Sequence, residues 1–308
     1  MVGGSNPPSP VGAFLGQVNY PMARYVILRM GHAGFFTIIR PANSFVAGLA
    51  AIVAYRIATG TLVYDVILLM AIVTLITAAG NVINDYYDAA IDAINRPGRP
   101  IPSGAVSRNA ALVYAGLLFF LGILLAGFTS LLCLAIALFN TILLVAYAAR
   151  LKSTPFFGNV TVSYLAASIF LFGGALAGVN RVPDMLPLVA ITFLAMLARE
   201  LLKDAEDIDG DRAGGADTLP IRIGVRKTAL LAFVFAVAAV AASALPSLWW
   251  GAYYLGAIAL VDIVIALAAF RALGCTDPGC VKATGSTSLL KIGMFASLVV
   301  FTLSAVLL

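Results

Sequence analysis

The chain has 308 residues, of which 62% are hydrophobic and only 11% are charged. Soluble domains carry about 25% charged residues, so this composition excludes a water-soluble globule and predicts that lipid surrounds most of the chain. The net charge of +5 is small, and the basic residues are scattered between apolar segments. This distribution argues against a nucleic-acid partner and fits a protein embedded in the lipid bilayer.

The N-terminal residues 1–20 are rich in Pro, Gly and Ser, and they lack the charged start and apolar run of a signal peptide. We interpret them as a flexible tail before a single membrane domain, residues 21–308. We predict that residues 20–35 form an interfacial helix on the cytoplasmic face, before the first membrane span. His32, the only histidine, is expected to have a structural or interfacial role there.

Nine segments are long and apolar enough to cross a bilayer, which requires roughly 20 apolar residues each. The predicted fold is therefore an all-α, polytopic membrane bundle of about nine transmembrane helices. The predicted spans are residues 38–58, 63–85, 109–127, 129–149, 160–179, 185–204, 227–245, 249–270 and 287–307.

The basic residues predict the orientation of the bundle. When the nine spans alternate in direction, 17 of the 19 Lys and Arg residues fall on one side, and only Arg56 and Arg181 fall on the other. Because Lys and Arg are in excess on cytoplasmic loops, this side is predicted to be cytoplasmic. The N-terminus is then inside and the C-terminus outside a multi-pass protein of the cell membrane.

The three cysteines give limited information. Cys133 lies in an apolar run and is predicted to be a small core residue. Cys275 and Cys280 bracket a short loop, which leaves two alternatives open, a disulfide or two free thiols.

Most acidic residues fall in two patches, residues 81–92 and 200–211, which end the second and sixth predicted spans on the cytoplasmic side. At about 100° of rotation per residue, five polar side chains of each patch lie within an arc of roughly 100°. These are Asn81, Asn84, Asp85, Asp88 and Asp92 in the first patch, and Glu200, Lys203, Asp204, Asp207 and Asp211 in the second. The two sets are 119 residues apart, about four spans, which suggests an ancestral duplication.

Such stripes indicate a site for Mg²⁺ and a diphosphate. Like-charged carboxylates on one helix face repel each other, so cations must neutralise them. Mg²⁺ is usually held by one or two carboxylates together with substrate phosphates. Bound Mg²⁺ would stabilise the negative charge on a departing pyrophosphate.

At these residues the sequence resembles the UbiA superfamily of intramembrane prenyltransferases. Asn84-x-x-x-Asp88-x-x-x-Asp92 is similar to the first aspartate-rich motif of the family, and Asp207-x-x-x-Asp211 is similar to the second. Three further segments are similar to family patterns: residues 40–43, 95–104 and 147–152. The resemblance covers about residues 35–300 and implies nine helices around a central cavity, capped by cytoplasmic loops.

The resemblance also implies roles for individual residues. The catalytic carboxylates would be Asp88, Asp92, Asp207 and Asp211, and the Mg²⁺ ligands would add Asn84, Asp85 and Asp204. Basic and polar side chains would bind the isoprenyl diphosphate donor; the candidates are Tyr147, Lys152, Arg96, Arg99, Lys203, Arg40 and Asn43.

The acceptor is predicted from residues 198–224, which look like the branch of the family that makes archaeal ether lipids. Those enzymes transfer a geranylgeranyl group to the lipid-soluble acceptor geranylgeranylglyceryl phosphate. Arg24, Arg29, Arg222 and Arg226 are candidates for binding the phosphate of the acceptor. The alternative is an aromatic acceptor such as 4-hydroxybenzoate.

Two other classes of membrane protein fit the sequence less well. A transporter would carry its acidic residues near the membrane midplane, whereas both patches here end at one face. A CDP-alcohol phosphotransferase would carry its acidic motif on one helix, whereas these patches lie four spans apart. The sequence makes no prediction of oligomeric state.

Overall fold

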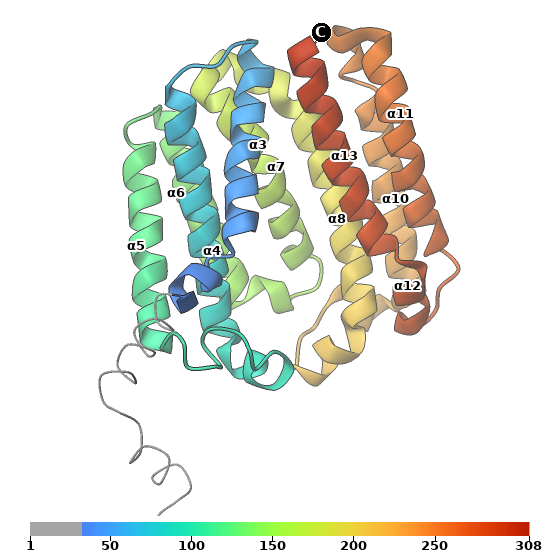
Figure 1. The fold of residues 1–308 in the computed structure, drawn as a ribbon. Helices are drawn as coiled ribbons and strands as arrows, with labels where there is room; N and C mark the ends of the chain where they lie inside the picture. The colour runs from blue at the N-terminus through green and yellow to red at the C-terminus, as the bar shows by residue number, and fades with distance from the viewer. Residues whose placement is uncertain (1–32, 308) are drawn as a thin grey trace, which may run out of the picture.

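The computed structural model describes residues 33–307, and every regular element in that range is a helix (Figure 1). Nine helices in this range are long and apolar enough to cross a membrane, which confirms the predicted nine-helix membrane bundle. They are α3 (Pro41–Thr59), α4 (Asp65–Asn95), α5 (Arg108–Ala126), α6 (Leu131–Ala149), α7 (Phe157–Ala177), α8 (Val182–Ala213), α10 (Val225–Ser243), α11 (Ser247–Arg271) and α13 (Ser286–Leu307).

Short helical segments join the long helices. They are η1 (Leu151–Ser153), η2 (Val179–Arg181), α9 (Leu219–Ile223) and α12 (Pro278–Thr284), and residues 33–38 are also helical. The predicted tail, most of the predicted interfacial helix, Arg24, Arg29 and His32 lie outside the described residues.

Two helices, α4 and α8, are much longer than the spans predicted for them. The predicted spans ended at residues 85 and 204, whereas the helices end at Asn95 and Ala213. With 31 and 32 residues, each is about 46–48 Å long, against a hydrocarbon core of about 30 Å. The acidic patches therefore lie within about the last four turns of two continuous helices.

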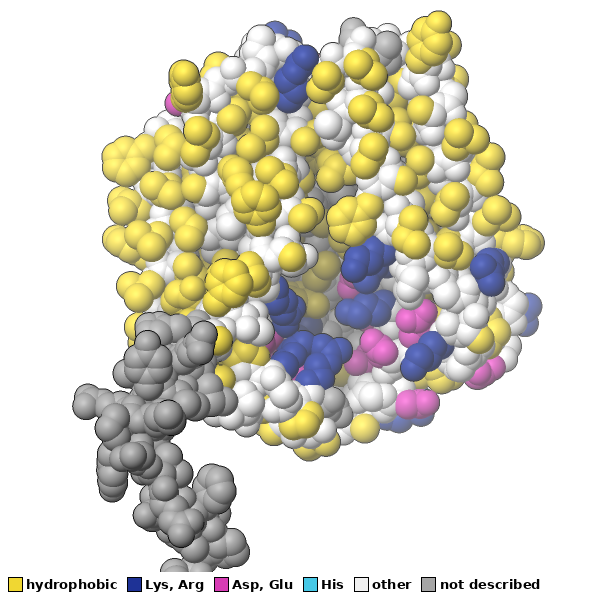
Figure 2. Space-filling model, viewed as in Figure 1, with side chains coloured by type: hydrophobic (Ala, Val, Ile, Leu, Met, Phe, Trp, Pro, Cys, Tyr) yellow, Lys and Arg dark blue, Asp and Glu magenta, His cyan; other side chains and the backbone are white. Residues whose placement is uncertain are grey.

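The helices pack into two hydrophobic cores. One core is formed mainly by α4, α5 and α6, and the other mainly by α8, α10, α11 and α13. Helices α3 and α7 pack against each other, α3 packs on α4, and α7 packs on α8. Figure 2 shows a hollow in the surface between the two halves of the bundle.

Close contact between α3 and α7 depends on Gly173. A Cβ atom added to Gly173 would lie 2.5 Å from the backbone carbon of Ala54 and 2.7 Å from the backbone nitrogen of Tyr55. Small residues let membrane helices approach at this distance. The glycine therefore sets the separation of two helices that lie between the two cores.

We expect Gly173→Ala to lower stability by about 1–3 kcal/mol, because the added methyl group forces the two backbones apart. Gly116→Ala is the matched control, since no atom lies within 4 Å of a Cβ at Gly116 on α5. Thermal unfolding of detergent-purified protein, followed by tryptophan fluorescence, should show a lower Tm for the first variant alone. Equal Tm values for the two variants would contradict the role of Gly173.

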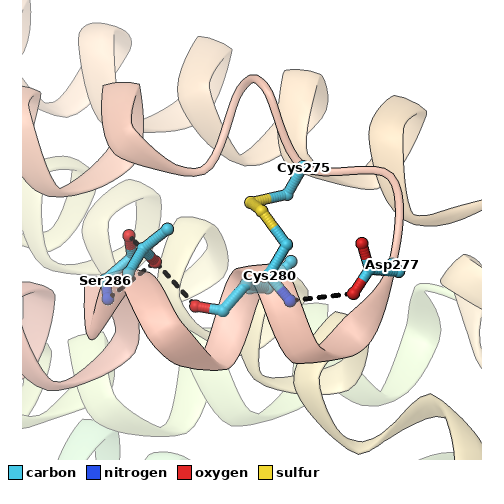
Figure 3. Close-up of a disulfide and its surroundings, with 6 residues drawn as sticks. Cys275, Asp277, Cys280 and Ser286 are labelled. Carbon is cyan, nitrogen blue, oxygen red and sulfur yellow. Dashed lines mark hydrogen bonds between the residues drawn. A yellow bond between two sulfur atoms is a disulfide. The ribbon is translucent and has the colours of Figure 1, made fainter.

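The loop between α11 and α12 contains a disulfide between Cys275 and Cys280 (Figure 3). Asp277 caps α12 by accepting a hydrogen bond from the backbone N–H of Cys280 at 2.9 Å. Of the two alternatives that the sequence left open, the structure contains the disulfide. Cys133 is fully buried and free, as predicted.

Candidate active site

The two acidic stripes lie at the same end of the bundle, on the last turns of α4 and α8. Figure 1 shows both helix ends at the bottom of the view, with the C-terminus at the opposite end. The two helix ends lie close together: a Cβ added to Gly214, directly after α8, would lie 3.1 Å from Cδ1 of Ile91 on α4. Lys, Arg, Asp and Glu side chains gather around the hollow at this end (Figure 2).

The α4 stripe divides into two groups according to its partners. In the first group, the Asn84 amide donates a hydrogen bond to Asp88 Oδ2 at 2.9 Å. The ammonium group of Lys152, on η1, is ion-paired with the other oxygen of Asp88. This group therefore points toward the connection between α6 and α7.

The second group is held by two arginines. Arg40 Nη2 lies 2.6 Å from Asp85 Oδ1, and Arg99 Nη1 lies 3.1 Å from the same oxygen and 2.6 Å from Asp92 Oδ2. Asp85 is 3% exposed and Asp92 is 6% exposed. Buried carboxylates are costly without a partner, so the two guanidinium groups make this burial possible.

Asn81 fixes the position of Arg40. Its side-chain amide donates to the Ile39 carbonyl at 3.1 Å and to Ser44 Oγ at 3.2 Å, and its oxygen lies 3.4 Å from Arg40 Nη1. Arg40 has a left-handed backbone (φ 49°) immediately before α3, an uncommon conformation for a residue other than glycine. The amide of Asn81 thus holds the turn from which Arg40 reaches Asp85.

Two open cavities lie beside this arginine group. The larger has a volume of about 340 Å³, and its lining includes the three arginines Arg40, Arg96 and Arg99 together with Asp85. The smaller, of about 210 Å³, is lined by Ala33, Gly34 and Thr37 and by parts of the loop after α4. The larger cavity therefore carries a surplus of positive charge.

The α8 stripe has different partners. Asp204 Oδ2 accepts a hydrogen bond of 2.7 Å from the amide of Asn159 on α7. Glu206 accepts hydrogen bonds of 2.9 and 3.1 Å from Thr287 at the start of α13. Within residues 33–307, neither Asp207 nor Asp211 forms an ion pair.

Glu200, one turn before Asp204, does have cationic partners. It is ion-paired with Arg199, and Lys203 Nζ lies 4.0 Å from its second oxygen. Arg199 and Lys203 thus form their ion pairs with Glu200 and not with Asp204, Asp207 or Asp211.

The connection between α6 and α7 links the two stripes. Its Lys152 contacts Asp88, and Asn159, in the first turn of α7 directly after it, contacts Asp204. The Ser153 carbonyl accepts a hydrogen bond of 3.0 Å from the backbone N–H of Asp217. The connection is tight, because a Cβ on Gly158 would lie only 2.7 Å from the Leu151 carbonyl oxygen. A short segment therefore sets the spacing between the carboxylates of α4 and α8.

Tyr147, near the end of α6, lies within electrostatic range of both stripes. Asp88 of α4 and three carboxylates of α8, those of Glu200, Asp204 and Asp211, all lie close enough to act on it.

Arg222, a candidate for binding an acceptor phosphate, already has an anionic partner. Its Nε lies 3.0 Å from both carboxylate oxygens of Asp217. This hydrogen bonding lowers the pKa of Asp217 below its ordinary value. An incoming phosphate would have to compete with Asp217 for Arg222.

The structure brings most of the predicted residues together, with two exceptions. Asn43 is exposed and makes no side-chain hydrogen bond within the described residues, and Lys203 turns toward Glu200. Sequence reasoning missed Asn159, which contacts Asp204, and Thr218, which lies beside Asp211. The 119-residue offset, applied to Arg40 and Arg99, would have pointed to both.

The donor set suits Mg²⁺ bound together with a substrate better than Mg²⁺ in a preformed cage. Within residues 33–307, no three acidic side chains, histidines or cysteines converge on one point. Mg²⁺ commonly uses one or two carboxylates and completes its shell with water and phosphate oxygens. The separated carboxylates of α4 and α8 fit that requirement.

A nine-helix membrane bundle that gathers carboxylates of two long helices, together with Lys and Arg side chains, at one end is typical of an intramembrane enzyme. The chain belongs to the UbiA prenyltransferase family, which it matches over residues 43–299, and it is a membrane prenyltransferase.

Known proteins of the family resemble the chain over nearly its whole length. It is 74% identical to digeranylgeranylglyceryl phosphate synthase of Methanoregula boonei, over 91% of this chain and 100% of that protein. A solved structure of a digeranylgeranylglyceryl phosphate synthase superposes with a TM-score of 0.79 and 34% identity, over 90% of this chain and 99% of the other. A UbiA homologue from Archaeoglobus fulgidus, solved with DMAPP and Mg²⁺, shares the fold (TM-score 0.61, 15% identity, covering 87% and 99%).

We expect Asp85→Asn to destabilise the protein by about 2–3 kcal/mol, because two guanidinium groups then face a neutral amide. The cost is set below the 3–5 kcal/mol of a fully buried pair, since the Arg40 side chain is 39% exposed. Asp209→Asn, an exposed position on the same end of α8, is the matched control. Thermal unfolding in detergent gives the Tm of both variants. An unchanged Tm for Asp85→Asn would contradict the stabilising role of the ion pairs between Asp85 and the two arginines.

Proposed function

We propose that the protein transfers a geranylgeranyl group from geranylgeranyl diphosphate to the free hydroxyl of geranylgeranylglyceryl phosphate, with Mg²⁺ as cofactor. The observation that carries this proposal is the arrangement of the two stripes, with Lys152 and Asn159 of one short segment contacting Asp88 and Asp204. The acceptor is assigned by analogy with the synthase of Methanoregula boonei, which is 74% identical.

The carboxylates are proposed to hold Mg²⁺ and, through it, the diphosphate. Mg²⁺ supplies charge stabilisation for the leaving group, as expected for a fold shared with a homologue solved with DMAPP and Mg²⁺. The ligand candidates are Asp88, Asp92, Asp207, Asp211 and Asn84, with Asp85 and Asp204 in supporting positions.

The basic and polar side chains are proposed to bind the diphosphate oxygens directly. Lys152 is the first candidate, because it already contacts a carboxylate of the site and donates from a flexible stem. Arg40, Arg96 and Arg99 line one cavity beside the α4 stripe. Tyr147, Lys203 and Asn43 complete the set of candidates.

In the proposed reaction the allylic C–O bond of the donor breaks, and its electron pair leaves with pyrophosphate. The acceptor hydroxyl oxygen forms the new C–O bond to the allylic carbon and gives its proton to one of the motif carboxylates or to the released pyrophosphate. An ordered cluster of cations near the leaving group lowers the barrier, because it stabilises charge that develops in the transition state. The hollow between the two cores would admit the prenyl chains from the lipid.

The site is proposed to face the cytoplasm. Of the 19 Lys and Arg residues, 17 fall on the side that carries both stripes, as expected for the cytoplasmic side of a membrane protein. The water-soluble diphosphate group would then reach the site without crossing the bilayer.

Asp88→Ala and Asp207→Ala should each reduce turnover by at least about 100-fold, because each removes a charge proposed to hold the metal–diphosphate group. Both proteins should still be extracted and elute as folded species, since both side chains are partly or fully exposed. Product formation from labelled donor measures the effect, with Asp209→Ala as the control. Retention of more than about a tenth of the activity by both variants would contradict the assignment.

Acceptor screening tests the function itself. Detergent-purified protein receives labelled geranylgeranyl diphosphate and Mg²⁺, with either geranylgeranylglyceryl phosphate or 4-hydroxybenzoate, and a parallel sample contains EDTA. We expect product only from the glyceryl phosphate and only with Mg²⁺. Product from 4-hydroxybenzoate alone would replace the acceptor and keep the reaction class, whereas EDTA-resistant turnover would overturn the metal dependence.

A further inference from the structure

Within residues 33–307, two residues other than glycine have a left-handed backbone, Arg40 (φ 49°) and Phe156 (φ 68°). Each directly precedes a long helix, α3 or α7. Residues in such strained conformations persist only where the surrounding structure holds them, and they cluster at functional sites. Arg40 reaches Asp85 from its turn. Phe156 has no polar side-chain group, so its conformation needs another explanation.

Phe156 is the central residue of a three-residue γ-turn. The backbone N–H of Phe157 donates a hydrogen bond of 2.8 Å to the Pro155 carbonyl, and Phe156 between them has φ 68° and ψ −38°. A γ-turn with a positive φ is rare and strained, above all for a bulky side chain. The Phe156 carbonyl also accepts a hydrogen bond of 3.0 Å from the N–H of Val160. The direction in which α7 leaves the turn therefore depends on the backbone of Phe156.

The loop that leads into this turn is tightly folded. The Leu151 carbonyl accepts hydrogen bonds from the backbone N–H of Thr154 at 3.0 Å and from its hydroxyl at 2.6 Å. The backbone of Gly158 lies against the same carbonyl, with no room for a Cβ. The backbone of Phe156 therefore cannot rotate without moving the start of the loop, which carries Lys152, relative to α7.

The ring of Phe156 is held by a phenylalanine of α10. It stacks on Phe235, with 6.3 Å between the ring centroids and 27° between the ring planes. Stacked aromatic pairs at such separations are favourable, and both rings pack against the core formed mainly by α8, α10, α11 and α13. Because α10 packs on α8, the stack links the strained turn to the half of the bundle that carries the second stripe.

We propose that Phe156 is a positioning residue for prenyl transfer, and that Phe235 is its anchor. The stacked ring keeps the turn in its left-handed form, so that Lys152 and Asn159 reach their carboxylates on α4 and α8 at the same time. The inference rests on the proposed function, in which Lys152 is the first candidate for binding the diphosphate. Without the anchor, residue 156 would return to a negative φ, and Lys152 would move away from the site.

Two substitutions at one position separate the backbone from the ring. Phe156→Ala removes the ring and keeps a Cβ, which disfavours a positive φ, whereas Phe156→Gly removes both and permits the turn. We expect the KM for the prenyl diphosphate donor to rise at least tenfold in Phe156→Ala and less than threefold in Phe156→Gly. The KM for the acceptor should change less than twofold. Loss of packing alone predicts no advantage for glycine, and partial unfolding lowers kcat without changing either KM.

Substitutions on α10 test the anchor. Phe235→Ala should raise the donor KM at least fivefold in the wild-type protein. In the Phe156→Gly background it should add less than twofold, because no ring is left to hold and coupled residues are not additive. Phe233→Ala is the matched control, since Phe233 packs on Phe270 of α11 at the same centroid separation of 6.3 Å. It should change the donor KM less than twofold.

Hydrogen exchange provides a readout that does not require activity. The N–H of Asp217 donates to the Ser153 carbonyl of the loop at 3.0 Å, so a displaced loop exposes this amide. In folded, detergent-purified protein its exchange should be at least tenfold faster in Phe156→Ala and Phe235→Ala. It should change less than threefold in Phe156→Gly and Phe233→Ala. If Phe156→Ala does not fold, Phe235→Ala with and without Phe156→Gly carries the test.

Three results would overturn the inference: a donor KM in Phe156→Gly as high as in Phe156→Ala, an equal effect of Phe233→Ala and Phe235→Ala, or unchanged Asp217 exchange in the folded variants that lose the stack. A failure of the proposed function looks different. In that case the wild-type protein shows no Mg²⁺-dependent prenyl transfer, and the exchange of the Asp217 amide still decides whether the stacked rings hold the loop.

Discussion

Repulsion between clustered carboxylates is the constraint on which the rest of this structure depends. Two long helices carry seven aspartates to one end of a membrane bundle, where burial and low dielectric strengthen every like-charge contact. The α4 stripe meets this constraint with ion pairs to two arginines and a lysine. The α8 stripe meets it with ion pairs to Glu200 and with neutral hydrogen-bond donors such as Asn159 and Thr287.

The fold supports the site through a small number of connections. Residues 152–159, from η1 to the first turn of α7, contact a carboxylate on each long helix, and Asn81 holds the turn that carries Arg40. Glu206 ties α8 to the start of α13 through Thr287. Because these contacts involve five different helices, the site would be sensitive to changes in packing far from the carboxylates, such as the separation of α3 and α7.

Much of the fold and the outline of the site could be predicted from the sequence. Hydropathy located nine spans, and a period of 3.6 residues placed Asn84, Asp88 and Asp92 on one helix face. Hydropathy failed at the ends of α4 and α8, because charged residues stop an apolar window although the backbone remains helical. It also could not identify partners: that Arg99 reaches both Asp85 and Asp92 depends on the path of a loop, which no local pattern encodes.

The number of helices in each half has a consequence for how such a site can be built. Four long helices, α3 to α6, precede α7, and four more, α7, α8, α10 and α11, follow before α13. An even number of crossings returns the chain to the face where it started, so a repeated four-helix unit inserts in the same direction twice. The aspartates of both copies then lie on the same side of the bilayer. With a unit of three or five helices, they would lie on opposite sides.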